Sequence, residues 1–382
     1  MKHRIYADNA ATTMLCSAAS KEMARYLARR GGNPSGLYLE GRIAKEELEG
    51  ARTKIACCIG ANPSEIIFTS GGTEADNAAI YTAAEHGAKY GKHHIVASPI
   101  EHHAVLKALD ALSEQGFDVE YLPVKASGIV NPRDVWSAIR GNTCLVTVMA
   151  ANNEIGTIQP ITEIGKICRK KHVLFHTDAV QAVGHIPFYV EDMCVDFLAA
   201  SGHKFGAPTG VGFLYARSKS VDSVFPMTVG GSQERGRRAG TENVLGAVGM
   251  AAALEDSMLP TYQHTKMMRE RLIDGILTIP GAKLNGDRVN RLPGNANICF
   301  DGVAGEPLVL LLDEMGIAAS SGSACTTGEH AGSYVLKAIG RSDAEARSAL
   351  RLTISEDTTV DDVDEIIRAV TICVSRLRLI GK

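Results

Sequence analysis

The sequence has little that would mark a binder of nucleic acid or of membranes. Its 382 residues carry 40 Lys and Arg against 43 Asp and Glu, a net charge of −3, so no positive excess is available to attract nucleic acid or anionic lipid. No apolar stretch approaches the length of a bilayer-spanning helix, and the first residues lack the apolar core of a secretion signal. These absences predict a cytoplasmic protein that acts on small molecules.

Paired cysteines are also missing. The nine cysteines are an odd number and show no paired CxxC spacing, so neither a disulfide framework nor a zinc site is predicted. Cys144 lies inside an apolar run, which is typical of a small core residue. Adjacent Cys57 and Cys58 have no chemical role that the sequence suggests, and we expect them to pack in the core on a helix over residues 42–60.

The chain is long enough for two domains, at roughly 100–200 residues each. Short apolar runs alternate with helical patterns from residue 65 onward, which predicts an α/β fold with a mostly parallel sheet covered by helices on both faces. The expected strands are at 65–70, 94–98, 118–124, 144–150, 173–178, 196–201 and 211–216. One helix between them is expected over 101–116, where Val105, Leu109 and Leu112 recur at helical spacing.

The pattern changes after about residue 255. Long helices are expected over 258–277 and 360–380, a shorter helix over 305–316, and strands at 295–302 and 348–355. This pattern predicts a smaller α+β domain formed by residues 1–13 and 258–382, beside a large domain formed by residues 14–257.

A lysine in an unusual setting follows the expected strand at 196–201. Lys204 stands among glycines and small residues in "SGHKFGAPTGVG", between two apolar runs. It therefore falls on a loop at the edge of the sheet, where binding and catalytic side chains are commonly carried. A solvated loop lysine is the alternative.

Other strand ends carry polar groups as well. "GGTEADNAAI" follows the strand at 65–70 and offers a glycine turn and a helix N-terminus to an anion such as phosphate, although a plain tight turn is an alternative. It lacks the GxGxxG and GxxxxGK[ST] spacings, which disfavours dinucleotides and nucleoside triphosphates. Asn152 and Asn153 follow the strand at 144–150, and Asp178 and Gln181 follow the strand at 173–178. Turn formation or helix capping would also account for them.

A phosphate cradle, a strand-end carboxylate and a loop lysine together match the needs of pyridoxal phosphate. The desolvated amine of Lys204 would form the Schiff base, and Asp178 would pair with the pyridinium nitrogen of the cofactor. His102, just past the strand at 94–98, could stack on the ring and transfer protons near neutral pH. A capping histidine is the alternative, and spacing does not exclude His103 for the same role.

Ten stretches, in order and across nearly the whole chain, resemble the cysteine desulfurases, which are pyridoxal phosphate enzymes of aminotransferase fold type I, class V. The stretches are "YADNAATT", "GNPSG", "FTSGGTEADN", "EHHAV", "NNEIG", "HTDAVQ", "SGHKFGAPTGVG", "RAGTEN", "SSGSACT" and "LRLTIS". The resemblance implies a large domain with a seven-stranded, mostly parallel sheet and a smaller α+β domain.

The resemblance also implies a role for each matching residue. Lys204 would be the Schiff-base lysine, Asp178 the pyridinium partner and His102 the stacking acid–base residue. Gln181 and Asn153 would hydrogen-bond to the cofactor, and its phosphate would be held by Gly72, Thr73, Ser201 and His203. Thr241 would reach the phosphate of a neighbouring subunit, which implies a homodimer with shared active sites.

Cys325 is the residue that separates desulfurases from ordinary class V aminotransferases. Gly322, Gly328 and Gly332 surround it, so its loop has little to pack, and a mobile thiol suits sulfur transfer. A buried structural cysteine is the alternative. The longer "SSGSAC" loop resembles the variety that serves iron–sulfur cluster assembly.

Two more residues would bind substrate. Arg351, which alternates with Leu350 and Leu352 on a strand, would grip the substrate carboxylate, although a solvent-facing arginine fits the same pattern. Asn33, in "GNPSG", resembles the family residue at the mouth of the site, and it also fits a plain turn.

The resemblance therefore predicts an L-cysteine desulfurase that makes L-alanine and a persulfide on Cys325. The expected partners are L-cysteine, a second copy of the chain, and an iron–sulfur scaffold or another sulfur acceptor. No metal is expected at the cofactor site, although Cys325 is a candidate transient ligand of an iron–sulfur unit. A class V aminotransferase, a selenocysteine lyase and a non-catalytic pyridoxal phosphate-binding sulfur carrier are the alternatives.

Overall fold

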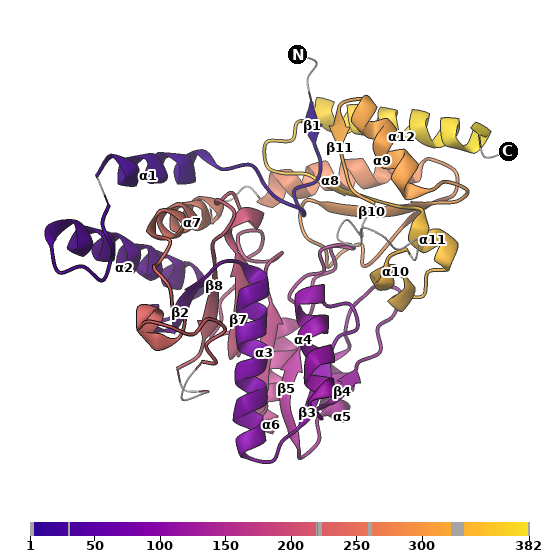
Figure 1. The fold of residues 1–382 in the computed structure, drawn as a ribbon. Helices are drawn as coiled ribbons and strands as arrows, with labels where there is room; N and C mark the ends of the chain where they lie inside the picture. The colour runs from indigo at the N-terminus through magenta and orange to yellow at the C-terminus, as the bar shows by residue number, and fades with distance from the viewer. Residues whose placement is uncertain are drawn as a thin grey trace.

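A seven-stranded sheet forms the centre of the larger part of the molecule (Figure 1). The computed structural model describes residues 4–29, 31–218, 220, 224–258, 262–321 and 332–380. The strands of this sheet are β2 (Ile66–Thr69), β3 (His94–Ala97), β4 (Asp118–Tyr121), β5 (Thr143–Thr147), β6 (Leu174–Asp178), β7 (Phe197–Ser201) and β8 (Gly212–Ala216). Their order is β2-β8-β7-β6-β5-β3-β4; β8 is antiparallel to both neighbours, and the pairings from β4 to β7 are parallel. The predicted mostly parallel α/β fold is confirmed.

Helices cover both faces of this sheet, which explains why its strands are continuously apolar. Phe197 and Ala199 of β7 pack in a cluster with α3 (Gly72–Lys89) and α4 (His103–Glu114). Leu198 and Ala200 point to the other face, because alternate residues of a strand face opposite ways. That face is covered by α2 (Leu39–Ile59), α5 (Pro132–Ala138), α6 (Ile161–Lys171) and α7 (Val244–Ser257).

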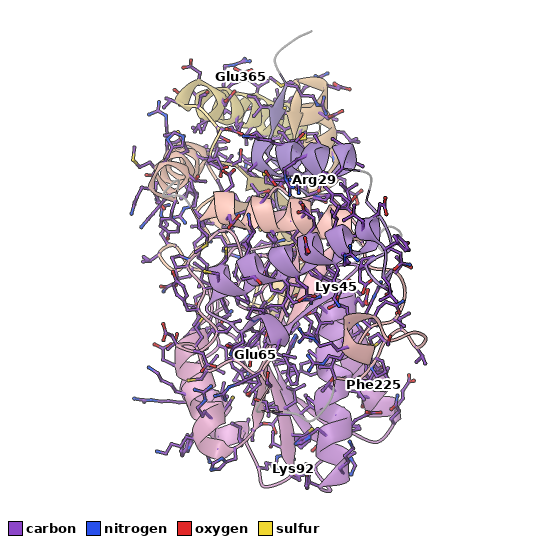
Figure 2. All side chains as sticks on the ribbon, turned by 90° about the vertical axis from the view of Figure 1, so that its left-hand side faces the viewer. Arg29, Lys45, Glu65, Lys92, Phe225 and Glu365 are labelled. Carbon is purple, nitrogen blue, oxygen red and sulfur yellow. The ribbon has the colours of Figure 1, made fainter. Side chains whose placement is uncertain are left out.

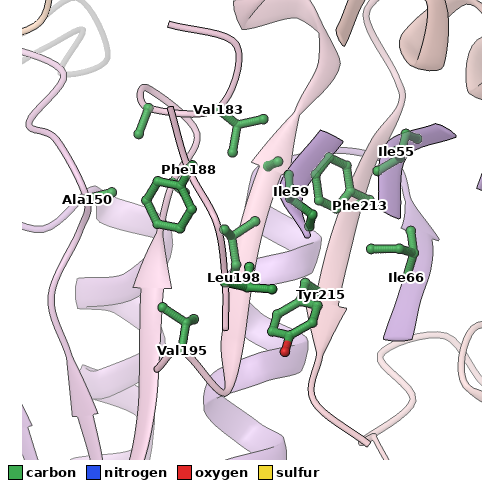
Figure 3. Close-up of a cluster of buried hydrophobic side chains, with 14 of the residues drawn as sticks. Ile55, Ile59, Ile66, Ala150, Val183, Phe188, Val195, Leu198, Phe213 and Tyr215 are labelled. Atoms are coloured by element: carbon green, nitrogen blue, oxygen red, sulfur yellow. The ribbon is translucent and has the colours of Figure 1, made fainter. Parts of the chain in front are cut away.

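The close-up in Figure 3 shows part of the second cluster. Ile55 and Ile59 of α2 lie against Phe213 of β8, beside Ile66 of β2. All four side chains are at most 2% exposed, so the helix is held on the sheet by hydrophobic burial.

A second sheet lies above the first in Figure 1. It is antiparallel, in the order β12-β10-β9, with β9 (Ala282–Leu284), β10 (Asn295–Phe300) and β12 (Ala349–Thr353). A short parallel pair, β1 (Ile5–Tyr6) and β11 (Ile317–Ala318), lies beside it. The helices of this part are α8 (Tyr262–Leu277), α9 (Gly305–Glu314), α10 (Tyr334–Ala338), α11 (Asp343–Arg347) and α12 (Val360–Ile380).

This upper part has a hydrophobic cluster of its own, which includes residues of β1, β10, β12, α8, α9 and α12. The division into a large domain of residues 14–257 and a small domain of residues 1–13 and 258–382 stays a prediction. The separate sheets and clusters support it.

The remaining helices are α1 (Ser17–Ala28) and the 3-10 turns η1 (Pro63–Glu65), η2 (Gly202–Lys204) and η3 (Gln233–Gly236). Charged side chains such as Arg29 and Lys45 are exposed around α1 and α2 (Figure 2). In the described part of the chain, every helix is too short or too polar to cross a bilayer.

Two cysteine predictions have different outcomes. Cys144 is buried, as predicted. The prediction of core packing is wrong for Cys57, which is exposed. One face of α2 is buried against the core and includes Ala56 and Ile59. Cys57 lies just outside this buried face.

Candidate active site

Polar side chains gather in a cavity beyond the carboxyl ends of the central strands. β3, β5, β6 and β7 are parallel and end at this edge, where open α/β sheets bind ligands. The cavity has a volume of about 260 Å³. Most of the predicted site residues line it: Gly72, Thr73, His102, Asn153, Asp178, Gln181, Ser201, His203, Lys204 and Arg351.

Lys204 lies on η2, the single 3-10 turn that follows β7, where a loop was predicted. Its Nζ donates hydrogen bonds to the carbonyl oxygens of Ala10 and Ala11, at 2.8 and 2.7 Å. The small residues around it are needed for close packing, since a Cβ added at Gly202 would lie 2.9 Å from the Cβ of Ala207. The N-terminal segment and the turn therefore hold the amine together at the wall of the cavity.

Asp178 is the last residue of β6 and is 4% exposed. Its Oδ1 accepts a hydrogen bond of 2.9 Å from the backbone N–H of Val180. Burial raises the pKa of Asp178, whereas His102 and Lys204 act in the opposite direction. The carboxylate is thus buried close to two cationic or ionisable groups, as a partner for a positively charged ring nitrogen must be.

His102 caps the N-terminus of α4, with its Nδ1 accepting a hydrogen bond of 3.1 Å from the backbone N–H of Ala104. It also lines the cavity, so capping and a role in the site are compatible. Burial lowers the pKa of His102; the charge of Asp178 opposes this effect, and the charges of His103 and Lys204 add to it. A neutral imidazole at physiological pH can accept a proton.

His103 lines the cavity too, and its ring centroid is 4.9 Å from that of Tyr334. The geometry therefore places both histidines of "EHHAV" at the site, and sequence spacing alone does not choose between them.

The glycine turn before α3 opens onto the cavity. No side chain caps the helix at Gly71, and a Cβ added at Gly72 would lie 2.5 Å from Cγ2 of Val180. Thr73 and Ser201 line the cavity beside it. An uncapped N-terminus of an 18-residue helix is suited to an anion such as phosphate.

His203 lines the cavity as well, and its Nδ1 shares a hydrogen bond of 3.1 Å with Oγ1 of Thr12. Burial lowers the pKa of His203 to about 4, and the charge of Lys204 acts in the same direction. His203 is therefore neutral near pH 7 and can offer an N–H group without adding a full charge.

Arg351 comes from β12 of the upper sheet and is 3% exposed, so the alternative of a solvent-facing arginine is wrong. Its Nη2 donates to Oδ1 of Asp8 at 2.8 Å, and its Nη1 donates to the carbonyl oxygen of Asn153 at 3.1 Å. The Nε atom is buried and has no hydrogen-bond partner among the described residues. The guanidinium group thus closes the cavity from the side opposite the large sheet.

Two predicted residues, Asn33 and Thr241, are described but do not line the cavity, and the position of a third, Cys325, is not described. Asn33 is exposed, and its Oδ1 accepts a hydrogen bond of 2.9 Å from the backbone N–H of Ser35, as in a plain turn. Thr241 is exposed, as a residue that serves a second subunit would be. Cys325 lies in residues 322–331, outside the described part of the chain.

Several residues of the site were missed by sequence reasoning. Asp76 and Glu154 line the cavity at 1% and 3% exposure, and Tyr334 lines it as well. Glu101 is fully buried behind His102, and its Oε1 accepts a hydrogen bond of 2.8 Å from the backbone N–H of Met149. Burial raises the pKa of Glu101 to about 8 and that of Glu154 to about 7. The sequence could have revealed Asp76. It shares helical spacing with the apolar residues Ala79, Ile80 and Ala83 of α3, so an acidic side chain falls on the buried face of that helix.

Comparison with known proteins identifies the family of this chain. The aminotransferase class-V family matches residues 5–366. The chain belongs to the aminotransferase class-V family. Among relatives of this family, the cysteine desulfurase IscS of Methanosarcina thermophila is 45% identical over 98% of this chain and 93% of its own length. The cysteine desulfurase IscS of Dictyoglomus turgidum is 43% identical over 100% of this chain and 97% of its own length.

Solved structures share the fold of this chain. A NifS-like protein superimposes with a TM-score of 0.91 and 36% identity over 98% of this chain and 100% of the other. The structure of SspA in complex with cysteine superimposes with a TM-score of 0.82 and 35% identity over 93% of this chain and 100% of the other.

Proposed function

We propose that this chain is a pyridoxal phosphate-dependent L-cysteine desulfurase. The observation that carries the proposal is the meeting of Lys204, Asp178 and His102 in one cavity beside an uncapped helix N-terminus. Its similarity to proteins named cysteine desulfurase, over nearly its full length, supports the same reaction. Its products would be L-alanine and a persulfide on Cys325.

The residues of the cavity fit the cofactor. Lys204 would hold it covalently through its amine, Asp178 would face its ring nitrogen, and His102 would lie against its ring. Gly72, Thr73, Ser201 and His203 would hold its phosphate, and all four line the cavity.

Two further residues are suited to hold the cofactor in place. Gln181 lines the cavity, and its Nε2 donates a hydrogen bond of 2.9 Å to the carbonyl oxygen of Ala10. The Oδ1 atom of Asn153 is buried with no hydrogen-bond partner among the described residues, which leaves an acceptor for a bound group. When bound, pyridoxal phosphate supplies an electron-accepting ring for the bond that breaks at the substrate Cα.

The side chains of the site would divide the remaining work. Arg351 would bind the substrate carboxylate through its unpartnered Nε and its Nη groups, in competition with Asp8. The amine of Lys204 would take the Cα proton, and His102 would accept or return a proton on the other side of the substrate. Lys204 and His102 both line the cavity, so both side chains would be able to reach a bound substrate.

Sulfur transfer would take place on Cys325. Its thiolate attacks the sulfur of L-cysteine, so an S–S bond forms while the substrate C–S bond breaks. The electron pair of that bond stays with the substrate carbon, which is protonated to give L-alanine. The sulfur is thereby oxidised and the carbon reduced, without an external oxidant.

We propose a homodimer as the working form, with an iron–sulfur scaffold or another sulfur carrier as the acceptor. The apolar side chains of Leu37 and Val229, which are 90% and 86% exposed, would be candidates for the interface between the two subunits. Exposed Thr241 would then reach the phosphate site of the second subunit. Sedimentation of the loaded protein tests this: a dimer is expected, and a monomer at working concentration would contradict it.

Mass spectrometry after a single exposure to L-cysteine tests the reaction. We expect the peptide that contains Cys325 to gain one sulfur atom while alanine appears in the same sample. Cys325→Ser should give neither product. Cys57→Ser is the matched control, because Cys57 is exposed and distant in sequence, and it should behave as the parent. Formation of a keto acid without persulfide would instead identify a transaminase.

A further inference from the structure

A surface segment between β8 and α7 carries one buried charged residue. The structure describes all of residues 227–243, and most of them are exposed or half-buried. Glu234, on the turn η3, is different, because its side chain is only 2% exposed. Burial of a carboxylate is costly unless it is paired and hydrogen-bonded, so the partners of Glu234 determine what this residue does.

Arg52 of α2 is the partner of Glu234. Its Nη1 and Nη2 donate to Oε2 and Oε1 of Glu234, at 2.7 Å each, and its own side chain is 5% exposed. Nη1 of Arg52 also donates to the carbonyl oxygen of Ile66 at 2.8 Å. Oε2 of Glu234 accepts a hydrogen bond of 3.0 Å from the backbone N–H of Phe68. The bidentate ion pair therefore attaches the surface segment to β2, an edge strand of the large sheet.

The backbone at this attachment has an unfavourable conformation. Glu234 and Arg235 have φ values of 47° and 60°, in the left-handed region that residues other than glycine rarely adopt. A buried ion pair is a modest source of stability, but it can select one arrangement of the groups that it joins. The Arg52–Glu234 pair therefore holds the segment in a shape that its backbone does not favour by itself.

A second arginine attaches the same segment to the start of α3. Nε of Arg238 donates to Oε1 of Glu74 at 3.0 Å, and Glu74 lies in the first turn of that helix. Within the segment, Oε1 of Gln233 accepts a hydrogen bond of 3.1 Å from the backbone N–H of Gly240. The chain is thus held on both sides of η3, directly before it reaches Thr241.

Thr241 does not use this support in its own subunit. It is exposed, and the cavity that contains Lys204 is lined by no residue of the segment 227–243, all of which the structure describes. A segment that is strained and attached at two points, and that leads to an exposed residue, is suited to present that residue to another molecule without a cost of ordering on binding. In the proposed homodimer, that molecule is the second subunit.

We propose that Glu234, held by Arg52, is a positioning residue for Thr241: the buried ion pair fixes the segment 227–243 in the shape that brings Thr241 to the cofactor phosphate of the neighbouring subunit. This inference rests on the proposed function for the cofactor and the homodimer. The ion pair itself belongs to the single chain, so it can be tested separately.

Hydrogen exchange of the full-length protein, followed by mass spectrometry, tests whether the ion pair holds the segment. Glu234→Gln keeps the shape of the side chain and removes its charge, so we expect the amides of residues 235–240 to exchange about tenfold faster than in the parent. Glu47→Gln is the matched control, because Glu47 forms another bidentate pair with Arg25, at 2.7 Å for both contacts. It should leave these amides unchanged. Exchange as slow in Glu234→Gln as in the parent would overturn the proposal.

Mixed dimers test the role across the two subunits. We expect the Glu234→Gln homodimer to bind pyridoxal phosphate, followed by its visible Schiff-base absorption, about tenfold more weakly than the parent. A mixed dimer joins one Glu234→Gln chain to one Lys204→Ala chain, so the chain that keeps Lys204 is served by the unchanged segment of the other. Its affinity should return to within about threefold of the parent. A site as weak as in the homodimer would show that Glu234 acts within its own subunit and would overturn the proposal.

Failure of the proposed function gives a different result. A parent protein that stays monomeric, or that gains no absorption with pyridoxal phosphate, would refute the homodimer or the cofactor and with it the role of Thr241. The exchange result for the ion pair would be unchanged.

Thermal unfolding identifies a variant that fails to fold. Arg52→Lys is then the second variant, since lysine keeps the positive charge but cannot form a bidentate pair. We expect the same faster exchange, the same weaker homodimer and the same recovery in the mixed dimer. Parent-like exchange and affinity in Arg52→Lys would contradict the proposal.

Discussion

The two ends of the cavity are built in different ways. At the cofactor end, Gly72, Asp178 and Lys204 follow or end strands of one sheet, so the packing of that sheet brings them together. At the substrate end, Arg351 and Asp8 are 343 positions apart and come from the upper part of the molecule. The cofactor end should therefore tolerate changes at the substrate end, whereas substrate binding depends on how the upper and lower parts are packed.

Removal of the central amine has the largest expected effect. Lys204→Ala should lower kcat/KM for alanine formation by about 1000-fold or more, because the group assigned to both cofactor attachment and proton transfer is lost. Lys45→Ala, at an exposed lysine of α2, is the control and should match the parent. Activity of Lys204→Ala within about tenfold of the parent would refute the assignment of this lysine.

Arg351→Ala tests whether the two ends are independent. We expect the KM for L-cysteine to rise about 100-fold, since a charged pair with the substrate carboxylate is lost. Cofactor affinity should change little, because Arg351 lies on the upper sheet. Arg368→Ala, on an arginine with 57% side-chain exposure, is the control. A parallel loss of cofactor affinity would show that the two ends are coupled.

Gly72→Ala perturbs the cofactor end alone. The added Cβ would lie 2.5 Å from Cγ2 of Val180, a stiff side chain that also lines the cavity, so Val180 or the glycine turn would have to move. We expect cofactor binding to weaken about tenfold and the free energy of unfolding to fall by about 1–3 kcal/mol. Gly50→Ala is the matched control: a Cβ there meets nothing within 4 Å in α2, and it should stabilise by about 0.5–1 kcal/mol.

The smallest expected effect is a change in the pH dependence of stability. Burial raises the pKa of Glu101 to about 8 from 4.5, so the folded chain holds this proton where the unfolded chain has lost it. Its contribution is complete below the unfolded pKa and is lost as pH rises through about 8. Denaturant unfolding should show a decline of about 2 kcal/mol between about pH 6 and 8 that is absent in Glu101→Gln. An identical slope in the variant would mean that another group causes it.

Sequence patterns predicted the large sheet well, for a physical reason. Strands buried on both faces are continuously apolar, and β5, β6 and β7 are at most one residue displaced from their expected starts. Because parallel strands of one sheet end at one edge, the residues that follow them are expected to lie together on the strength of the sequence alone. Lys204, Asp178 and Asn153 are predicted in this way, and all three line the cavity.

The contacts that surround a site residue could not be predicted in the same way. The alternation on β12 showed that Arg351 faces away from its leucines, but it could not show that Asp8 and Asn153 cover that face. The helical period of α2 likewise did not reveal that Cys57 falls just outside the buried face. The hydrophobic periodicity of a strand or helix predicts which face of that element a side chain occupies. It carries no information about which residues of other elements pack against that face.

The sequence by itself determined the order of elements, the strand ends and the residue types that suit pyridoxal phosphate chemistry, because these depend on local periodicity and on short motifs. Only the tertiary structure decided that Asp76 lies against His176, that Arg351 is paired with Asp8, and that Ala10 and Ala11 hold Lys204. Each of these contacts joins segments distant in sequence, and such contacts are set by the packing of helices and sheets against one another.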